Sequence, residues 1–155
     1  MPSDEKLSPH FQLSEFVHSQ AAVRLGLPNA PNPAALNNLR RLAQYLEQVR
    51  KALGDVPLLI SSGYRSPDVN RAVGGAASSA HLSGLAADFT APRFGSPREI
   101  CRLLAKADIP FDQLIYEGTW VHFAVAPAGV APRGEQLTAV FHPGAPTTYL
   151  KGGFA

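Results

Sequence analysis

Apolar residues recur every three or four positions along residues 33–53, which is the period of one face of an α-helix. Asn32 and Pro33 fit the N-cap and first turn of this helix, and Gly54 is placed to end it. We therefore expect one long amphipathic helix with a charged, solvent-exposed opposite face. Its buried stripe consists of Leu36, Leu39, Leu42, Ala43, Leu46, Val49 and Leu53.

Three further helical segments are expected, one of them a short helix after Pro67 that ends before Gly74-Gly75. Ser96 and Glu99 match a capping box with Pro97 at the first helical position, so a helix is expected to start there. A shorter helical segment is expected from residue 13 toward residues 25–26, with Ser14 as its N-cap. Residues 1–10 precede it and are expected to form a loose tail. The apolar face of the helix after Ser96 consists of Ile100, Leu103, Leu104 and Ala107.

Short apolar runs bounded by turn formers predict β-strands. They cover residues 57–61, 85–90, 114–116, 120–125 and 136–141. Residues 142–155, which contain Pro143 and Pro146, are expected to be irregular. Helices come first and strands cluster late, which is typical of an α+β fold. We expect a small antiparallel sheet with helices packed on it.

The length and composition fit one folded domain. A chain of 155 residues, 45% apolar and 17% charged, can bury one hydrophobic core and is not disordered. The formal net charge is only +2, and the basic residues are spread along the chain, so no nucleic-acid arm is expected. The single cysteine, Cys101, excludes a disulfide framework and a zinc site built on several thiolates.

One stretch carries the chemistry. His81 lies seven residues before Asp88, with Gly84 between them to permit a sharp turn, and His122 follows downstream. Asp88 lies within an apolar strand, where a buried carboxylate needs a partner or a metal. Two imidazoles and one carboxylate form a zinc-binding set that leaves one coordination position open. His122 taken alone has a simpler interpretation, a satisfied core histidine.

The substrate side of this site is also marked in the sequence. On the predicted strand 120–125, Trp120 and His122 share one face, so Trp120 would flank the ligand and wall a substrate groove. The small Ala86 shares a face with Asp88 and leaves room for a metal ion.

The motifs around these residues resemble a known family. They are Ser62-Gly-Tyr-Arg-Ser-Pro67, Asn70, Gly74-Gly75, Ser79-x-His81-x-x-Gly84-x-Ala86-x-Asp88 and Trp120-Val-His122. Together they resemble the zinc D-alanyl-D-alanine carboxypeptidase family of murein peptidases. This family includes bacteriophage endolysins and shares its fold with the Hedgehog signalling domain. The resemblance covers roughly residues 10–125 and is strongest over residues 61–122.

The resemblance implies a role for each candidate residue. It implies that His81, Asp88 and His122 bind one Zn²⁺ ion. It implies that Arg65 binds a substrate carboxylate or the developing oxyanion, which suits a charged fork of hydrogen-bond donors. The other residues expected to contact substrate are Tyr64, Ser79 and Trp120. A turn or capping role is the alternative for Ser79, and a surface turn position is the alternative for Arg65.

The general base is where this chain departs from many members of the family. Those members carry glutamate three residues before the last histidine, where Thr119 stands here and cannot act as a base. The nearest carboxylate is Glu117, whose odd separation from His122 would put the two on opposite faces of an unbroken strand. A turn at Gly118 would remove that objection, so we predict Glu117 as the base. The next candidates are Asp112 and Gln113.

The expected function is hydrolysis of an amide bond in peptidoglycan stem peptides, as a D-Ala-D-Ala carboxypeptidase or an endolysin-type endopeptidase. We expect a monomer with no nucleic-acid partner. The chain opens on polar residues without an apolar run, so no signal peptide or membrane span is expected. The protein would be made in the cytoplasm and act on the wall after release or delivery.

Two other functions remain open from the sequence. A non-catalytic wall-binding or phage structural module could keep the same fold, and Thr119 supports that alternative. A signalling domain of the Hedgehog kind is the third possibility.

Overall fold

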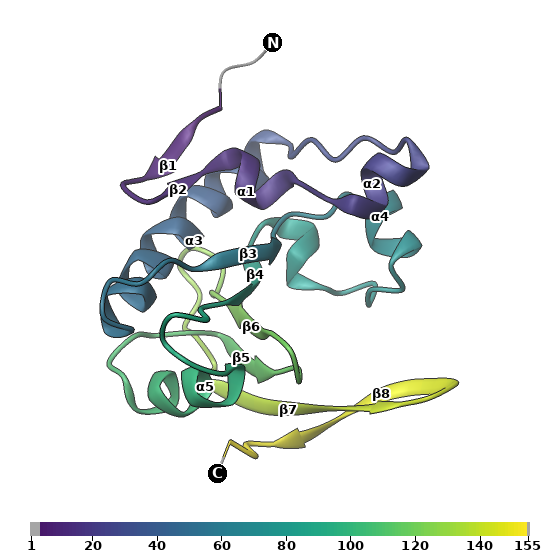
Figure 1. Cartoon of the computed structure of the whole chain (residues 1–155). Coiled ribbons are helices and arrows are strands. Elements are labelled where there is room, and N and C mark those ends of the chain that lie inside the picture. Colours follow the sequence, from purple (N-terminus) through teal and green to yellow (C-terminus); the bar gives the residue numbers. More distant parts are fainter. Residues whose placement is uncertain (1–3, 155) are drawn as a thin grey trace.

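The computed structural model describes residues 4–154. Figure 1 shows the N-terminal strands and short helices at one end of the molecule and the β7–β8 hairpin at the other, with strands β3, β4, β6 and β5 between them. The elements are β1 (Lys6–Ser8), β2 (Phe11–Gln12), α1 (Leu13–Val17), α2 (Gln20–Leu25), α3 (Pro33–Ala52), β3 (Leu59–Ser62), α4 (Pro67–Ala72), the 3-10 helix η1 (Ala80–Ser83), β4 (Ala86–Thr90), α5 (Pro97–Lys106), β5 (Gln113–Tyr116), β6 (Val121–Ala124), β7 (Glu135–His142) and β8 (Ala145–Lys151).

The main sheet has six strands in the order β3-β4-β6-β5-β7-β8. The α+β class is confirmed, but the expected small antiparallel sheet is larger and mixed, because β7 pairs with β5 in parallel. The physical reason lies in the β5–β6 hairpin. Since β6 already occupies one edge of β5, the chain crosses over after Ala124 and pairs β7 with the other edge.

The two long helices begin where the capping signals predict. The Asn32 side chain accepts a hydrogen bond of 2.8 Å from the backbone N–H of Ala35, which starts α3. Ser96 and Glu99 form the predicted capping box of α5, with both bonds at 3.2 Å. Side chains of α3 that are fully buried enter the main hydrophobic core, and they are Leu39, Leu42, Ala43, Leu46 and Val49.

The helical segment expected over residues 13–26 is two helices. Gln12, rather than Ser14, is the N-cap of α1, with Glu15 completing a capping box. The chain leaves the helix at His18, and the Ser19 side chain then caps α2. The apolar periodicity predicts a single helix here, but the second polar cap starts a new helix within the segment.

The expected loose tail is wrong for residues 4–10. Strand β1 pairs with β2, and Leu7 is buried in the main core. Both strands are too short to show a period in the sequence, so their order comes from tertiary contacts. The most extensive of these is made by Glu47 of α3, as described below. The part of the expected tail at residues 1–3 lies outside the described residues.

The expected irregular C-terminal segment is also wrong. Strand β8 pairs antiparallel with β7 through Ala145–Lys151. Pro143 and Gly144 form the two-residue connection, with Gly144 at a φ of 70°. Pro146 is tolerated because β8 is the edge strand of the sheet, where a missing backbone donor breaks no ladder. The prolines therefore mark a hairpin, and residue 155 lies outside the described part of the chain.

Within residues 4–154, none of the helices combines the length and the apolar character that crossing a bilayer would require.

Glu47 ties the β1–β2 hairpin to α3. Its carboxylate accepts hydrogen bonds from the Ser8 hydroxyl at 2.6 Å, the His10 backbone N–H at 2.7 Å and the His10 Nδ1 at 2.7 Å. Burial alone would raise the pKa of Glu47, but these hydrogen bonds hold it below its ordinary value of 4.5. A lowered folded-state pKa adds stability above the unfolded pKa, and this stability is lost as pH falls through the folded value.

We predict that Glu47→Ala lowers the free energy of unfolding by about 1–3 kcal/mol at neutral pH, because three donors lose a charged acceptor. Urea unfolding measures this, and the difference from the unsubstituted protein should shrink as pH falls below 4.5. Lys51→Ala, an exposed position on the same helix, is the control and should change stability by less than about 0.5 kcal/mol. Equal stability of the two variants would contradict this role for Glu47.

Candidate metal centre

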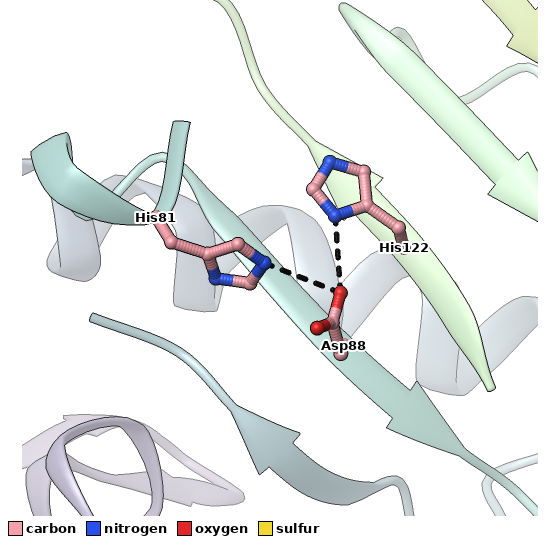
Figure 2. Close-up of side chains that lie close together, drawn as sticks. All are labelled: His81, Asp88 and His122. Carbon is pink, nitrogen blue, oxygen red and sulfur yellow. Dashed lines mark hydrogen bonds and ion pairs between the residues drawn. The ribbon is translucent and has the colours of Figure 1, made fainter. Parts of the chain in front are cut away.

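Two neighbouring strands and one 3-10 helix bring the three predicted ligands together. Asp88 of β4 lies directly opposite His122 of β6 in the antiparallel ladder, so both side chains stand on the same face of the sheet. His81 reaches them from η1. Figure 2 shows both imidazoles directed at one oxygen of Asp88. Their candidate ligand atoms all lie within 4.8 Å of one another, and all three residues are buried.

The position of His81 depends on how closely η1 packs on its neighbours. Gly84 ends η1 with a φ of 72°, and a Cβ there would lie 2.6 Å from the carbonyl oxygen of Ala35 in α3. The Ser79 hydroxyl accepts a hydrogen bond from the His81 backbone N–H at 3.2 Å and begins the 3-10 turn. The predicted sharp turn at Gly84 is therefore confirmed, and it holds His81 against the sheet.

The protonation of His81 tests whether the site fits a metal ion. Its Nδ1 lies 2.6 Å from the carbonyl oxygen of Gly63, which can only accept, so Nδ1 carries the proton. The other nitrogen, Nε2, is buried and makes no hydrogen bond among the described residues. Its lone pair faces Oδ1 of Asp88 at 3.3 Å. Two electron-rich atoms face each other here, which is the arrangement a cation between them would stabilise.

The second imidazole completes the set. Nδ1 of His122 lies 3.0 Å from the same Oδ1 of Asp88. Burial would raise the pKa of Asp88, but the hydrogen bond with His122 opposes this effect, and the pKa lies well below its ordinary value, so the carboxylate is ionised. Two nitrogens and one carboxylate oxygen are the donor set of an open, three-ligand zinc site. The residues present therefore fit one Zn²⁺ ion.

Arg65 lies beside this set, as predicted. Its Nη2 is 3.8 Å from Oδ2 of Asp88, and its Nη1 donates to the Asn70 side chain at 3.0 Å. Its Nε donates to the Ser62 hydroxyl at 3.3 Å. Burial lowers the pKa of Arg65, while the charges of Asp88 and Glu117 raise it, and a guanidinium remains charged in either case. The Arg65 guanidinium is thus a positive charge fixed by hydrogen bonds at the edge of the site.

Glu117 also reaches the site, because the chain turns where the sequence analysis required a turn. Gly118 has a φ of 82°, and the Glu117 backbone N–H donates to the Trp120 carbonyl at 3.1 Å. As a result, Oε1 of Glu117 lies 3.7 Å from Nδ1 of His122. Burial and then the charge of Asp88 raise the pKa of Glu117, with His122 and Arg65 opposing them. A carboxylate with a raised pKa beside a metal set is suited to proton transfer.

A cleft of about 600 Å³ opens onto these residues. It is lined by the three candidate ligands together with Arg65, Glu117, Ser79 and Trp120. Trp120 lies just before β6 rather than in it, and its indole nitrogen is buried without a hydrogen-bond partner in the described chain. Ser79 borders the cleft and also caps η1, as in the alternative interpretation. A substrate contact for either residue stays a prediction.

Tyr64 is not among the residues that line the cleft, so its predicted contact with substrate stays a prediction that this placement does not support. Its side chain is buried in the hydrophobic core, and its backbone N–H donates to the Phe16 carbonyl at 2.7 Å. A Cβ on the preceding Gly63 would lie 2.6 Å from that same carbonyl oxygen. This close approach carries the tyrosine ring inward and leaves Arg65 facing the cleft.

One wall of the cleft carries no signal in the sequence. Arg133 lines it from the loop before β7, Leu137 from β7 and Tyr149 from β8. Arg133 also pairs with Asp112, whose carboxylate accepts from the guanidinium at 2.8 Å. No motif marks these residues, and β8 was expected to be irregular, so no signal in the sequence placed them here.

Comparison with known proteins gives a consistent result. A family model described as Peptidase M15 matches residues 9–124, which is more than half of the 155 residues. A zinc D-Ala-D-Ala carboxypeptidase of Streptomyces albus G is 46% identical over 46 residues, which cover 30% of this chain. The chain spans only 18% of the length of that relative.

We predict that the protein binds one zinc ion per chain and that Asp88→Ala reduces zinc affinity by at least about 100-fold, because it removes one of the three candidate ligands and the only charged one. Zinc content after dialysis and titration calorimetry measure this. His142→Ala is the control, because His142 is exposed and hydrogen-bonds Thr148 on the hairpin. Equal loss of zinc in both variants, or zinc retained by Asp88→Ala, would contradict the site.

Proposed function

The chain belongs to the peptidase M15 family, and on that basis we propose that it is a zinc-dependent peptidase that hydrolyses an amide bond in peptidoglycan stem peptides. One observation carries the proposal. The unpaired Nε2 of His81 faces an ionised Asp88 inside a cleft that also holds a carboxylate with a raised pKa, Glu117. A structural zinc site needs no such carboxylate and no such opening.

We propose D-Ala-D-Ala carboxypeptidase activity as the specific reaction. The printed name of the Streptomyces albus G relative supports this substrate. The position of Arg65 supports it too, because a fixed guanidinium beside the metal set suits the free carboxylate of a C-terminal residue. Cleavage within a cross-link, as in endolysin-type endopeptidases, is the other outcome that the kinetic tests below distinguish.

The roles of the chain's own groups follow from where they lie. A zinc ion, when bound, would supply Lewis acidity to the scissile carbonyl and acidify a water molecule. Glu117 takes a proton from water in the cleft and delivers it to the leaving amine. Arg65 holds the substrate carboxylate, and Asn70 and Ser62 hold Arg65 in turn. The buried indole N–H of Trp120 lies near Glu117 and opposes the rise in the pKa of that carboxyl.

The alternative of a non-catalytic wall-binding or phage structural module keeps one argument in its favour, the threonine at position 119. The placement of Glu117 weakens it. A turn that brings a second carboxylate to 3.7 Å from His122 would serve no purpose in a module that only binds.

We further propose that the protein acts as a monomer and reaches the cell wall after release or delivery.

We predict that Glu117→Gln reduces kcat by about 10²–10⁴-fold, because it removes the proton acceptor and keeps the shape of the side chain. The assay follows D-alanine release from a zinc-loaded reaction with a pentapeptide ending in D-Ala-D-Ala, by mass spectrometry. Asp108→Asn, an exposed carboxylate outside the cleft, is the control and should match the unsubstituted enzyme. Zinc content should be unchanged in both variants. A protein that binds zinc and the peptide but releases nothing would instead be the non-catalytic module.

We predict that Arg65→Lys lowers kcat/KM by about 10–100-fold for a peptide with a free C-terminal carboxylate, because a point charge replaces a fork of donors. The loss should be much smaller for the same peptide with an amidated C-terminus. Arg71→Lys, an exposed arginine of α4, is the control. An equal loss on both peptides would show that Arg65 does not bind the carboxylate, and cleavage within a cross-link would then be favoured.

A further inference from the structure

The β7–β8 hairpin lies beyond residues 9–124, the part of the chain that the family model matches. It nevertheless contributes Leu137 and Tyr149 to the cleft that holds the metal set. In Figure 1 the hairpin runs along the end of the sheet remote from the N-terminal elements, so it forms one border of the sheet. The cleft therefore has a wall that the family match does not include.

The strand register shows that this wall is continuous with the site. His122 pairs with Ile115 of β5, and Ile115 pairs with Leu137 of β7. Directly paired residues share one face of a sheet. Because Asp88 pairs with His122, one row of side chains runs from the metal set onto the hairpin.

Tyr149 stands on this same face. It pairs with Ala139, which is two residues from Leu137 and therefore on the same side of β7. The neighbouring Leu150 points to the opposite face and does not line the cleft. Tyr149 is about half exposed, with 51% of its surface accessible, so its ring is open to a ligand in the cleft.

The hairpin is held in place by an aromatic contact. The rings of Trp120 and Phe141 lie 6.3 Å apart, which joins the β5–β6 turn to β7. The same turn carries Glu117. The candidate base and the hairpin wall are thus parts of one packed unit, and Tyr149 has a defined position relative to the base.

The strand order gives the cleft a direction. Arg65 follows β3 at one end of the sheet, the metal ligands stand on β4 and β6, and Tyr149 stands on β8 at the other end. A peptide whose terminal carboxylate lies at Arg65 would cross the metal set and continue over β5 and β7. Its preceding residues would then lie against the hairpin.

We infer that the β7–β8 hairpin is a substrate-binding wall for the peptide residues that precede the terminal D-Ala-D-Ala pair, and that the Tyr149 phenol contacts them directly. This inference rests on the proposed function. The phenol donates a hydrogen bond to a backbone carbonyl of the peptide, and Leu137 with the tyrosine ring contacts apolar carbon atoms of these residues. Burial and the charges of Glu117 and Asp88 raise the pKa of Tyr149, which keeps this donor protonated.

Two peptides test the inference, the dipeptide D-Ala-D-Ala and a pentapeptide that ends in the same two residues. Trp120 is the only tryptophan of the sequence and lines the cleft, so its fluorescence reports binding whether or not the peptide is cleaved. Zinc-loaded Tyr149→Phe should bind the pentapeptide about 3–10-fold more weakly than the unsubstituted protein, because one neutral hydrogen bond is lost. Tyr149→Ala should bind it more weakly still. Dipeptide binding and zinc content should be unchanged in both variants.

Leu150→Ala is the matched control, an exposed residue of the same strand on the opposite face, and it should bind both peptides normally. The inference is overturned if both Tyr149 variants bind the pentapeptide as tightly as the unsubstituted protein, or if they weaken the dipeptide by the same factor. It is also overturned if the unsubstituted protein binds no pentapeptide. D-alanine release, measured separately, decides the proposed carboxypeptidase reaction: binding that depends on Tyr149 without release would refute that reaction and leave the wall in place.

Discussion

An ionised aspartate buried in the middle of a sheet, with two imidazole nitrogens directed at one of its oxygens, is the constraint on which the rest of this structure depends. A charge in that position is costly unless it is compensated. His122 hydrogen-bonds Asp88, and Nε2 of His81 faces the same oxygen across the place that a cation would fill. These positions require η1 to press against α3 and β6 to pair with β4 in one register. A slip of one residue in that register would turn His122 to the other face and leave Asp88 with one partner.

The same constraint organises the surrounding charges. Arg65 and Glu117 approach the buried triad from different segments, and each influences the pKa of the other. Arg65 is held by hydrogen bonds, while Glu117 is placed by a tight turn at Gly118. This places one fixed cation, one proton acceptor and one metal-binding set within a single cleft. Such a combination suits hydrolysis of a charged peptide better than it suits a structural role.

Much of this could be predicted from the sequence because the signals are local. Caps at Asn32 and Ser96 set the starts of two helices, and the spacing of His81 and Asp88 around Gly84 reflects a compact turn between ligands. Glu117 could be proposed because a glycine follows it. Tyr64 could not be placed, since its direction depends on how closely Gly63 approaches Phe16. That distance is a tertiary property with no local signal.

The C-terminal hairpin could not be predicted from the sequence for a related reason. Prolines suggested an irregular segment, whereas an edge strand accepts them, and whether a strand lies at an edge depends on the whole sheet. The parallel pairing of β5 with β7 likewise depends on which edge of β5 remains free. The pairing of the strands in the sheet, rather than any local sequence pattern, therefore places Arg133 and Tyr149 in the lining of the cleft.

The most direct test is a crystal structure of the zinc-loaded protein, with anomalous diffraction collected on both sides of the zinc absorption edge. We expect one strong anomalous peak between Nε2 of His81, Oδ1 of Asp88 and Nδ1 of His122, with its open side toward Glu117 and the cleft. Zinc bound elsewhere, or a site that holds no metal in saturating zinc while His122 stays hydrogen-bonded to Asp88, would contradict the assignment of this site as a metal centre.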